Sequence, residues 1–180
     1  MLYGQNTQTA KAPAHIMIID FNLDFLRRAA VLIDASLDRL DRESGASQDP
    51  DAFGIFDEAE YLVGFGFVAC QTYLTAIASQ STLKGEKRKA LSLGPLHRTG
   101  QSMAQLVNAA ANYWKHSPEW SLDTPSIQAK QTLEVISRLG VDTSAPYPTA
   151  NMLYEILTPH PARFAPLLPF LTQWRNTLLR

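Results

Sequence analysis

The sequence predicts an all-α fold: a helical bundle of about five to seven helices around a central apolar helix, Tyr61–Ser79. Three observations predict it. The stretch from Tyr61 to Leu83 contains no charged residue, apolar side chains recur at three- and four-residue steps in the flanking segments, and stretches rich in Gly, Pro and Ser separate those segments. With 180 residues, of which 46% are hydrophobic, the chain is long and apolar enough to bury a core.

The N-terminal third contains a polar lead-in and one amphipathic helix. We expect residues 1–20 to form a flexible segment, which ends in a short apolar run, His15–Asp20, that suits either a strand or a helix start. Residues 22–42 then predict a helix with one apolar face. That face contains Leu23, Leu26, Ala30, Ile33, Leu37 and Leu40. Residues 43–53 are rich in Ser, Gly, Asp and Pro, and they predict a linker.

The central helix is predicted from about Phe56 to Ser81. Its uncharged run is long enough to cross a bilayer. Polar residues such as Gln71 and Thr72 interrupt the second half of the run, which favours a buried core helix over a membrane span. Gly64 and Gly66 would allow a close contact with a neighbouring helix. We therefore expect no contact with a membrane.

Five shorter helices are predicted after the central one. A basic helix over residues 84–93 ends at a Gly-Pro pair, and a second covers 96–116. The third has Thr124 as its N-cap and Pro125 in its first turn, and it ends before Gly140. Two more, at 150–157 and 162–179, follow a Pro-rich turn, and Pro166 and Pro169 bend or delay the last one.

The domain organisation follows from this order of elements. Residues 21–140 form the predicted helical bundle domain, and residues 141–180 form a C-terminal helical extension that packs on the same domain. The N-terminus lacks a charged start followed by an apolar run, so we see no secretory signal. The single cysteine, Cys70, gives no reason to expect an oxidising compartment, and we expect a cytoplasmic protein.

Composition limits the function classes. The formal net charge of −1 provides no global attraction to nucleic acid, so any RNA contact must come from a local patch. Charged residues are 18% of the chain, below the usual ~25%, which suggests that a second copy covers part of the surface in a homodimer. The four histidines and one cysteine lack zinc-site spacing, and there is no glycine-rich phosphate loop, so we expect no metal and no cofactor.

A polar stripe on the helix over 96–116 is the most informative feature. Asn108, Asn112 and His116 are spaced by four residues and so share one face, which Gln101 and Gln105 extend. This face carries amides and a histidine instead of the usual Lys and Glu. Amides hydrogen bond well in partly buried sites, so the stripe suits an interface, a ligand groove or a catalytic cleft.

The stretch Ala111-Asn112-Tyr113-Trp114-Lys115-His116 resembles the R-N-x-x-x-H motif of the HEPN superfamily of helical nucleotide-binding and RNase domains. Asn112 and His116 match the motif, and Ala111 stands in place of its arginine. The resemblance implies a dimeric helical bundle that binds RNA or a nucleotide. It also implies metal-independent cleavage, in which His116 transfers a proton and Asn112 orients it.

The missing motif arginine favours weak cleavage or none. In this reading, the residues that would contact the substrate are Asn108, Lys115 and Arg98. The alternative is a non-catalytic helical module for protein–protein interaction, either a homodimer or a complex with another protein partner. His116 would then only complement the dipole at a helix end, and Asn112 would lie at a helix contact. An open cleft that contains Asn112, His116 and a nearby cation would favour the first reading.

Overall fold

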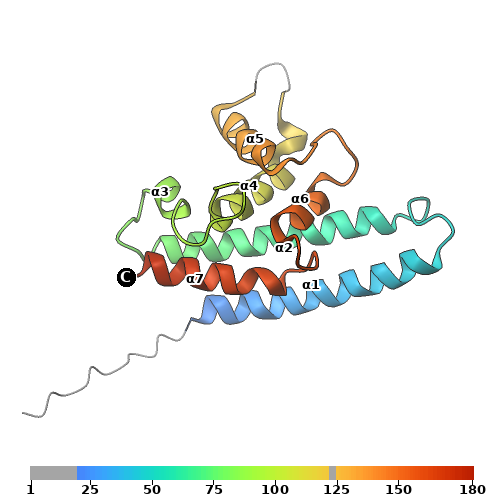
Figure 1. Cartoon of the computed structure of the whole chain (residues 1–180), viewed down its shortest axis with the longest axis horizontal. Helices are drawn as coiled ribbons and strands as arrows, with labels where there is room; N and C mark the ends of the chain where they lie inside the picture. The colour runs from blue at the N-terminus through green and yellow to red at the C-terminus, as the bar shows by residue number, and fades with distance from the viewer. Residues whose placement is uncertain (1–19, 122–124) are drawn as a thin grey trace, which may run out of the picture.

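The computed structural model describes residues 20–121 and 125–180. These residues form seven α-helices, two short 3-10 turns and no strand, which confirms the predicted all-α bundle (Figure 1). The helices are α1 (Phe21–Ala46), α2 (Ile55–Ala78), α3 (Lys87–Leu91), α4 (Met103–His116), α5 (Ile127–Leu139), α6 (Pro148–Leu157) and α7 (Leu168–Leu178). The 3-10 turns are Ser117–Glu119, which follows α4, and Ala165–Leu167, which precedes α7.

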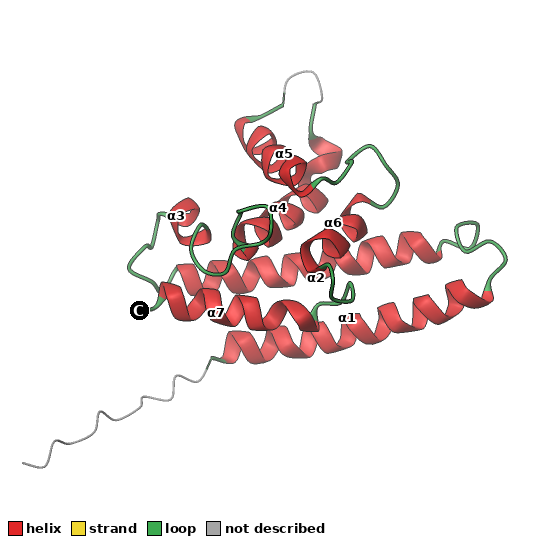
Figure 2. Ribbon diagram, viewed as in Figure 1, coloured by secondary structure: helices red, strands yellow, loops and turns green. Residues whose placement is uncertain are grey.

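The two long helices α1 and α2 lie side by side as a hairpin, four of the shorter helices pack on α2, and α5 packs on α4 and α6 (Figure 2). The helix α2 contacts α1, α4, α6, α3 and α7. Its side chains Phe67, Cys70 and Leu74 are almost fully buried. The predicted central helix is therefore the structural centre of the bundle. The extension after residue 140 contacts the same helices, because α6 and α7 both pack on α2 and α4.

Two glycines of α2 accept aromatic side chains directly on the helix backbone. A Cβ at position 64 would lie 2.1 Å from the indole of Trp114, and a Cβ at position 66 would lie 2.2 Å from the ring of Phe164. Phe164 is fully buried, so its ring has little room to move. The predicted close approach at these glycines is confirmed, although the partners are aromatic side chains rather than another helix backbone.

The start of α4 differs from the prediction. Residues 96–102 form a turn, closed by a hydrogen bond from His97 N to Gln101 O, and the helix begins at Met103 instead of Leu96. Ser102 sets this start, because its hydroxyl accepts from Gln105 N while the Gln105 side chain accepts from Ser102 N. This reciprocal capping box satisfies two backbone N–H groups that have no partner within the helix.

Other helix ends also differ from the predicted ends by a few residues. The helix α5 begins at Ile127, with Ser126 accepting a hydrogen bond from Ala129 N; the predicted cap Thr124 lies outside the described residues. The basic helix is shorter than predicted and covers only Lys87–Leu91, whereas α1 continues to Ala46 into the predicted linker. As predicted, the final α-helix is delayed: Pro166 lies in the preceding 3-10 turn.

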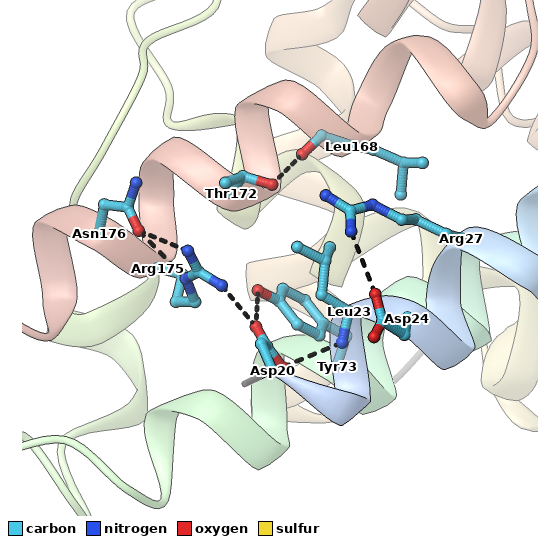
Figure 3. A network of polar contacts seen from close by, with 9 residues as sticks. All are labelled: Asp20, Leu23, Asp24, Arg27, Tyr73, Leu168, Thr172, Arg175 and Asn176. Carbon is cyan, nitrogen blue, oxygen red and sulfur yellow. Dashed lines mark hydrogen bonds and ion pairs between the residues drawn. The ribbon is translucent and has the colours of Figure 1, made fainter. Parts of the chain in front are cut away.

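A buried carboxylate ties the start of α1 to two other helices (Figure 3). Asp20 accepts from Leu23 N at 3.0 Å, from the Tyr73 hydroxyl at 3.1 Å and from the Arg175 guanidinium at 2.8 Å. Only 7% of the Asp20 side chain is exposed. Burial raises the pKa of this carboxyl, but the hydrogen bonds and the charge of Arg175 outweigh burial and hold the pKa below its usual value.

By length and composition, α2 is the one helix of the described chain that could cross a membrane, and half of its most apolar window is buried inside the bundle. The buried half faces α1 and α4. Tyr61 and Phe65 are on the exposed side of the helix.

Substituting Gly66→Ala will destabilise the fold. Alanine gains about 1 kcal/mol over glycine in a helix, but forcing a methyl group against a packed ring costs about 1–3 kcal/mol, so we expect a net loss of up to about 2 kcal/mol. Urea unfolding followed by circular dichroism measures it. Gly45→Ala is the matched control: nothing lies within 4 Å of a Cβ there, and it should stabilise the protein slightly. Equal effects at both positions would contradict the contact argument.

Removing the buried carboxylate with Asp20→Ala should cost about 2–4 kcal/mol, because a helix cap and one partner of a buried ion pair are lost together. Since folding lowers the pKa of Asp20, its stabilising contribution is present above the ordinary carboxyl pKa and is lost as the pH falls through the lowered value. Urea unfolding at neutral and acidic pH measures both effects. Asp24→Ala, which removes an exposed carboxylate in the same helix turn, should change little.

Candidate functional site

A cleft of about 720 Å³ opens between α3, α4 and α5. Polar and apolar surface contribute about equally to its wall, and the polar part consists mainly of six amide side chains, three cations and one carboxylate. The amides are Gln101, Gln105, Asn108, Asn112, Gln128 and Gln131; the charged residues are Lys87, Arg88, Arg138 and Glu134. The amide stripe predicted on α4 therefore faces a cleft and not bulk solvent alone.

The elements around the cleft hold part of this wall rigid. Gln101 is buried; its amide nitrogen donates to Val135 O of α5 at 3.3 Å, and its oxygen accepts from the Thr99 hydroxyl at 3.1 Å. Gln105 is held by the capping box at the start of α4. Gln128 and Gln131 on α5 are exposed and lie across from α4. One wall is therefore held by hydrogen bonds, and the other carries exposed amides.

A buried glutamine of α2 organises the two asparagines. The amide nitrogen of Gln71 donates to Asn108 Oδ1 at 3.0 Å and to Asn112 Oδ1 at 2.8 Å. Its oxygen accepts from Lys115 Nζ at 2.6 Å. Only 6% of Gln71 is exposed, so these contacts replace water. The sequence singled out Gln71 only as a polar interruption of the apolar helix; that isolated amide was the available signal for a site residue.

Two of the three cations that line the cleft have no carboxylate partner within the described chain. In the described chain, Lys87, Arg88 and Lys115 take part in no ion pair. Arg138, by contrast, bonds Glu134 at 2.6 Å. Burial and the nearby charge of Lys115 lower the pKa of Lys87. Two ammonium groups are thus held near each other without a counter-ion, an arrangement that an anionic ligand would relieve.

The structure brings together some of the predicted site residues and separates others. Asn108 and Asn112 line the cleft, and Lys115 joins them through Gln71. His116 is not among the lining residues: it is the last residue of α4, and its Nδ1 lies 3.5 Å from Glu119 Oε2 in the following 3-10 turn. Asn112 and His116 therefore do not share this cleft, although they lie only one helical turn apart.

Arg98 also lies away from the cleft. Its guanidinium bonds the backbone carbonyl of Glu155 at 3.0 Å and pairs with the carboxylate of the same residue. It therefore joins the turn before α4 to α6. Lys87 and Arg88, which do line the cleft, belong to the basic helix predicted over residues 84–93. Only the packing of α3 beside α4 reveals their position.

Ala111, at the place of the motif arginine, is fully buried in the hydrophobic core. A side chain at this position faces the core and not the cleft, so a cation there would not reach a ligand. Among the residues in the described ranges, no three His, Cys, Asp or Glu side chains gather in a way that could hold a metal ion. The chemistry available at the cleft is therefore hydrogen bonding and charge.

Comparison with protein-family models, curated proteins and solved structures found no match. The resemblance to HEPN domains thus rests on the six residues Ala111–His116 and stays a prediction.

Proposed function

We propose that the chain binds RNA or a nucleotide in the cleft between α3, α4 and α5. The observation that carries this proposal is a set of cations without ion-pair partners, Lys87 and Arg88, next to a row of amide side chains on one wall. The volume of about 720 Å³ lies within the range of small-molecule sites.

The two kinds of side chain suit the two parts of such a ligand. Lysine and arginine bind phosphate through charge-assisted hydrogen bonds. The glutamine side chains of the cleft offer donors and acceptors that match base edges and ribose hydroxyls. The local positive charge also supplies the attraction that the overall charge of −1 does not.

Binding without efficient cleavage fits the geometry best. Metal-independent cleavage of RNA needs a proton-transfer group beside the scissile phosphate and a cation on the developing charge. His116 does not line the cleft, and Ala111 is buried. Asn112 is the one motif residue placed to contact a bound ligand directly. We therefore assign it to binding.

Reversing the cleft charges with Lys87→Glu and Arg88→Glu together should weaken binding of a short single-stranded RNA about tenfold or more and reduce its salt dependence, because phosphate contacts release counter-ions. Fluorescence anisotropy over a range of salt concentrations measures both. The matched control is Lys84→Glu with Lys89→Glu, which makes the same charge change in the same segment at positions that do not line the cleft. An equal loss in both double variants would contradict a specific site.

A second candidate function, assembly with another copy of the chain, is favoured by an exposed apolar stripe on α1. Phe21, Phe25 and Leu32 are 66%, 64% and 71% exposed. Their spacing of four and seven residues puts them on one face of the helix. Arg28 lies between Phe25 and Leu32 on this face, with its guanidinium carbon 5.9 Å from the centre of the Phe25 ring. Large exposed apolar side chains on one helix face are typical of interaction surfaces. The near-zero net charge leaves little repulsion between copies.

We expect the wild-type chain to be a dimer at micromolar concentration and Phe25→Glu with Leu32→Glu to be a monomer, because charges on the stripe would have to be buried in the contact. Light scattering coupled to size exclusion gives the mass. Ile127→Glu, an equally exposed apolar position on α5, should leave the mass unchanged. A wild-type monomer would rule out this assembly and leave the binding cleft unaffected.

A further inference from the structure

We infer that the cleft recognises an oxyanion, namely a phosphate group, through a donor-only site formed by the side-chain NH₂ groups of Asn108 and Asn112. Lys115 sets the orientation of both amides through Gln71. The inference rests on the proposed function and names the part of the nucleotide or RNA that the asparagines contact. Gln71 and Lys115 act as positioning residues, since the structure gives them each other and the asparagines as partners.

Lys115 fixes the orientation of the Gln71 side-chain amide. A lysine ammonium carries three hydrogens and no acceptor, so the atom that faces it must be an acceptor. Lys115 Nζ lies 2.6 Å from one end of the Gln71 amide. That end is therefore the oxygen, and the opposite end is the NH₂ group.

The orientation of Gln71 in turn fixes the orientation of two side-chain amides on α4. The NH₂ group of Gln71 has two hydrogens, and its nitrogen lies 3.0 Å from the Asn108 side chain and 2.8 Å from the Asn112 side chain. Both facing atoms must accept, so both are Oδ1. Because Gln71 is buried, no water is available to replace a lost partner, and turning one amide over would leave two donors facing each other.

The side-chain NH₂ groups of the two asparagines remain available for a ligand. Each Oδ1 is directed to Gln71, so each Nδ2 is the remaining polar end of a residue that lines the cleft. Neither Nδ2 donates to a partner within the described chain. Since both Oδ1 atoms lie within 3.0 Å of a single nitrogen, the two amides are close neighbours. Two NH₂ groups at adjacent positions suit two oxygens of one ligand group.

The charged residues around the two asparagines favour a negatively charged ligand group. Lys87 and Arg88 add further donors, and neither has an ion-pair partner among the residues described. The one carboxylate on the wall, Glu134, is paired with Arg138. At the NH₂ groups of Asn108 and Asn112 an amino or ammonium group would meet donors, whereas a phosphate offers several acceptor oxygens and negative charge. The asparagines therefore hold phosphate and do not read a base.

The test compares adenosine monophosphate, adenosine and inorganic phosphate on the full chain by calorimetry. We expect the monophosphate and inorganic phosphate to bind and adenosine to bind at least about tenfold more weakly, as lost charge-assisted hydrogen bonds predict. Inorganic phosphate should also shift the side-chain NH₂ resonances of Asn108 and Asn112 selectively. This spectroscopic readout uses the wild-type protein and needs no variant to fold.

Three variants test the orientation. Asn112→Asp, nearly identical in shape, exchanges the donor for a charged acceptor and should abolish phosphate binding. Lys115→Met should weaken it about tenfold by freeing the Gln71 amide, and Lys115→Arg, again a donor-only cation, should restore it. Thermal melts check folding. Equal weakening by Lys115→Met and Lys115→Arg would overturn the positioning role.

The failures of the two proposals are distinguishable. If adenosine and its monophosphate bind equally well and Asn112→Asp keeps this binding, the donor-only site is overturned while nucleotide binding stands. If neither RNA nor the monophosphate binds the wild-type chain, the proposed function falls, and this inference falls with it.

Discussion

The whole arrangement depends on the close packing of aromatic side chains on the backbone of α2. Gly64 and Gly66 leave gaps that Trp114 of α4 and Phe164, just before the final 3-10 turn, fill. Interiors of this density hold their neighbours in one position, since small shifts produce either overlap or voids. The contact at Gly64 sets the position of α4 along α2. It thereby sets which residues of α4 meet Gln71.

The same helix carries the polar contact that gives the cleft its chemistry. Burying an amide among apolar side chains is unfavourable unless every donor and acceptor finds a partner. Gln71 meets this condition with Lys115, Asn108 and Asn112, and no buried side-chain polar atom in the described residues lacks a partner. The requirement for satisfied hydrogen bonds in the core thus imposes an orientation on residues at the surface. The buried amide of Gln71 and the cleft residues Asn108 and Asn112 therefore belong to one hydrogen-bond network.

Two surfaces of the bundle differ in chemical character. The cleft lies between α3, α4 and α5 and is rich in amides and cations. The α1 stripe that contains Phe25 and Leu32 is apolar and exposed. Assembly through the second surface would leave the first one accessible. The two proposals of ligand binding and self-association are therefore compatible, and either can fail without the other.

The sequence by itself determined the features that depend on local periodicity. The all-α class, the central position of the uncharged helix and the shared face of Asn108 and Asn112 all follow from residue spacing along one helix, because a helix repeats every 3.6 residues whatever surrounds it. Only the tertiary structure decided which elements meet. It placed α3 beside α4, joined Gln71 to the asparagines, and left His116 outside the cleft. Contacts between segments distant in the chain depend on packing, and no spacing within a single segment encodes them.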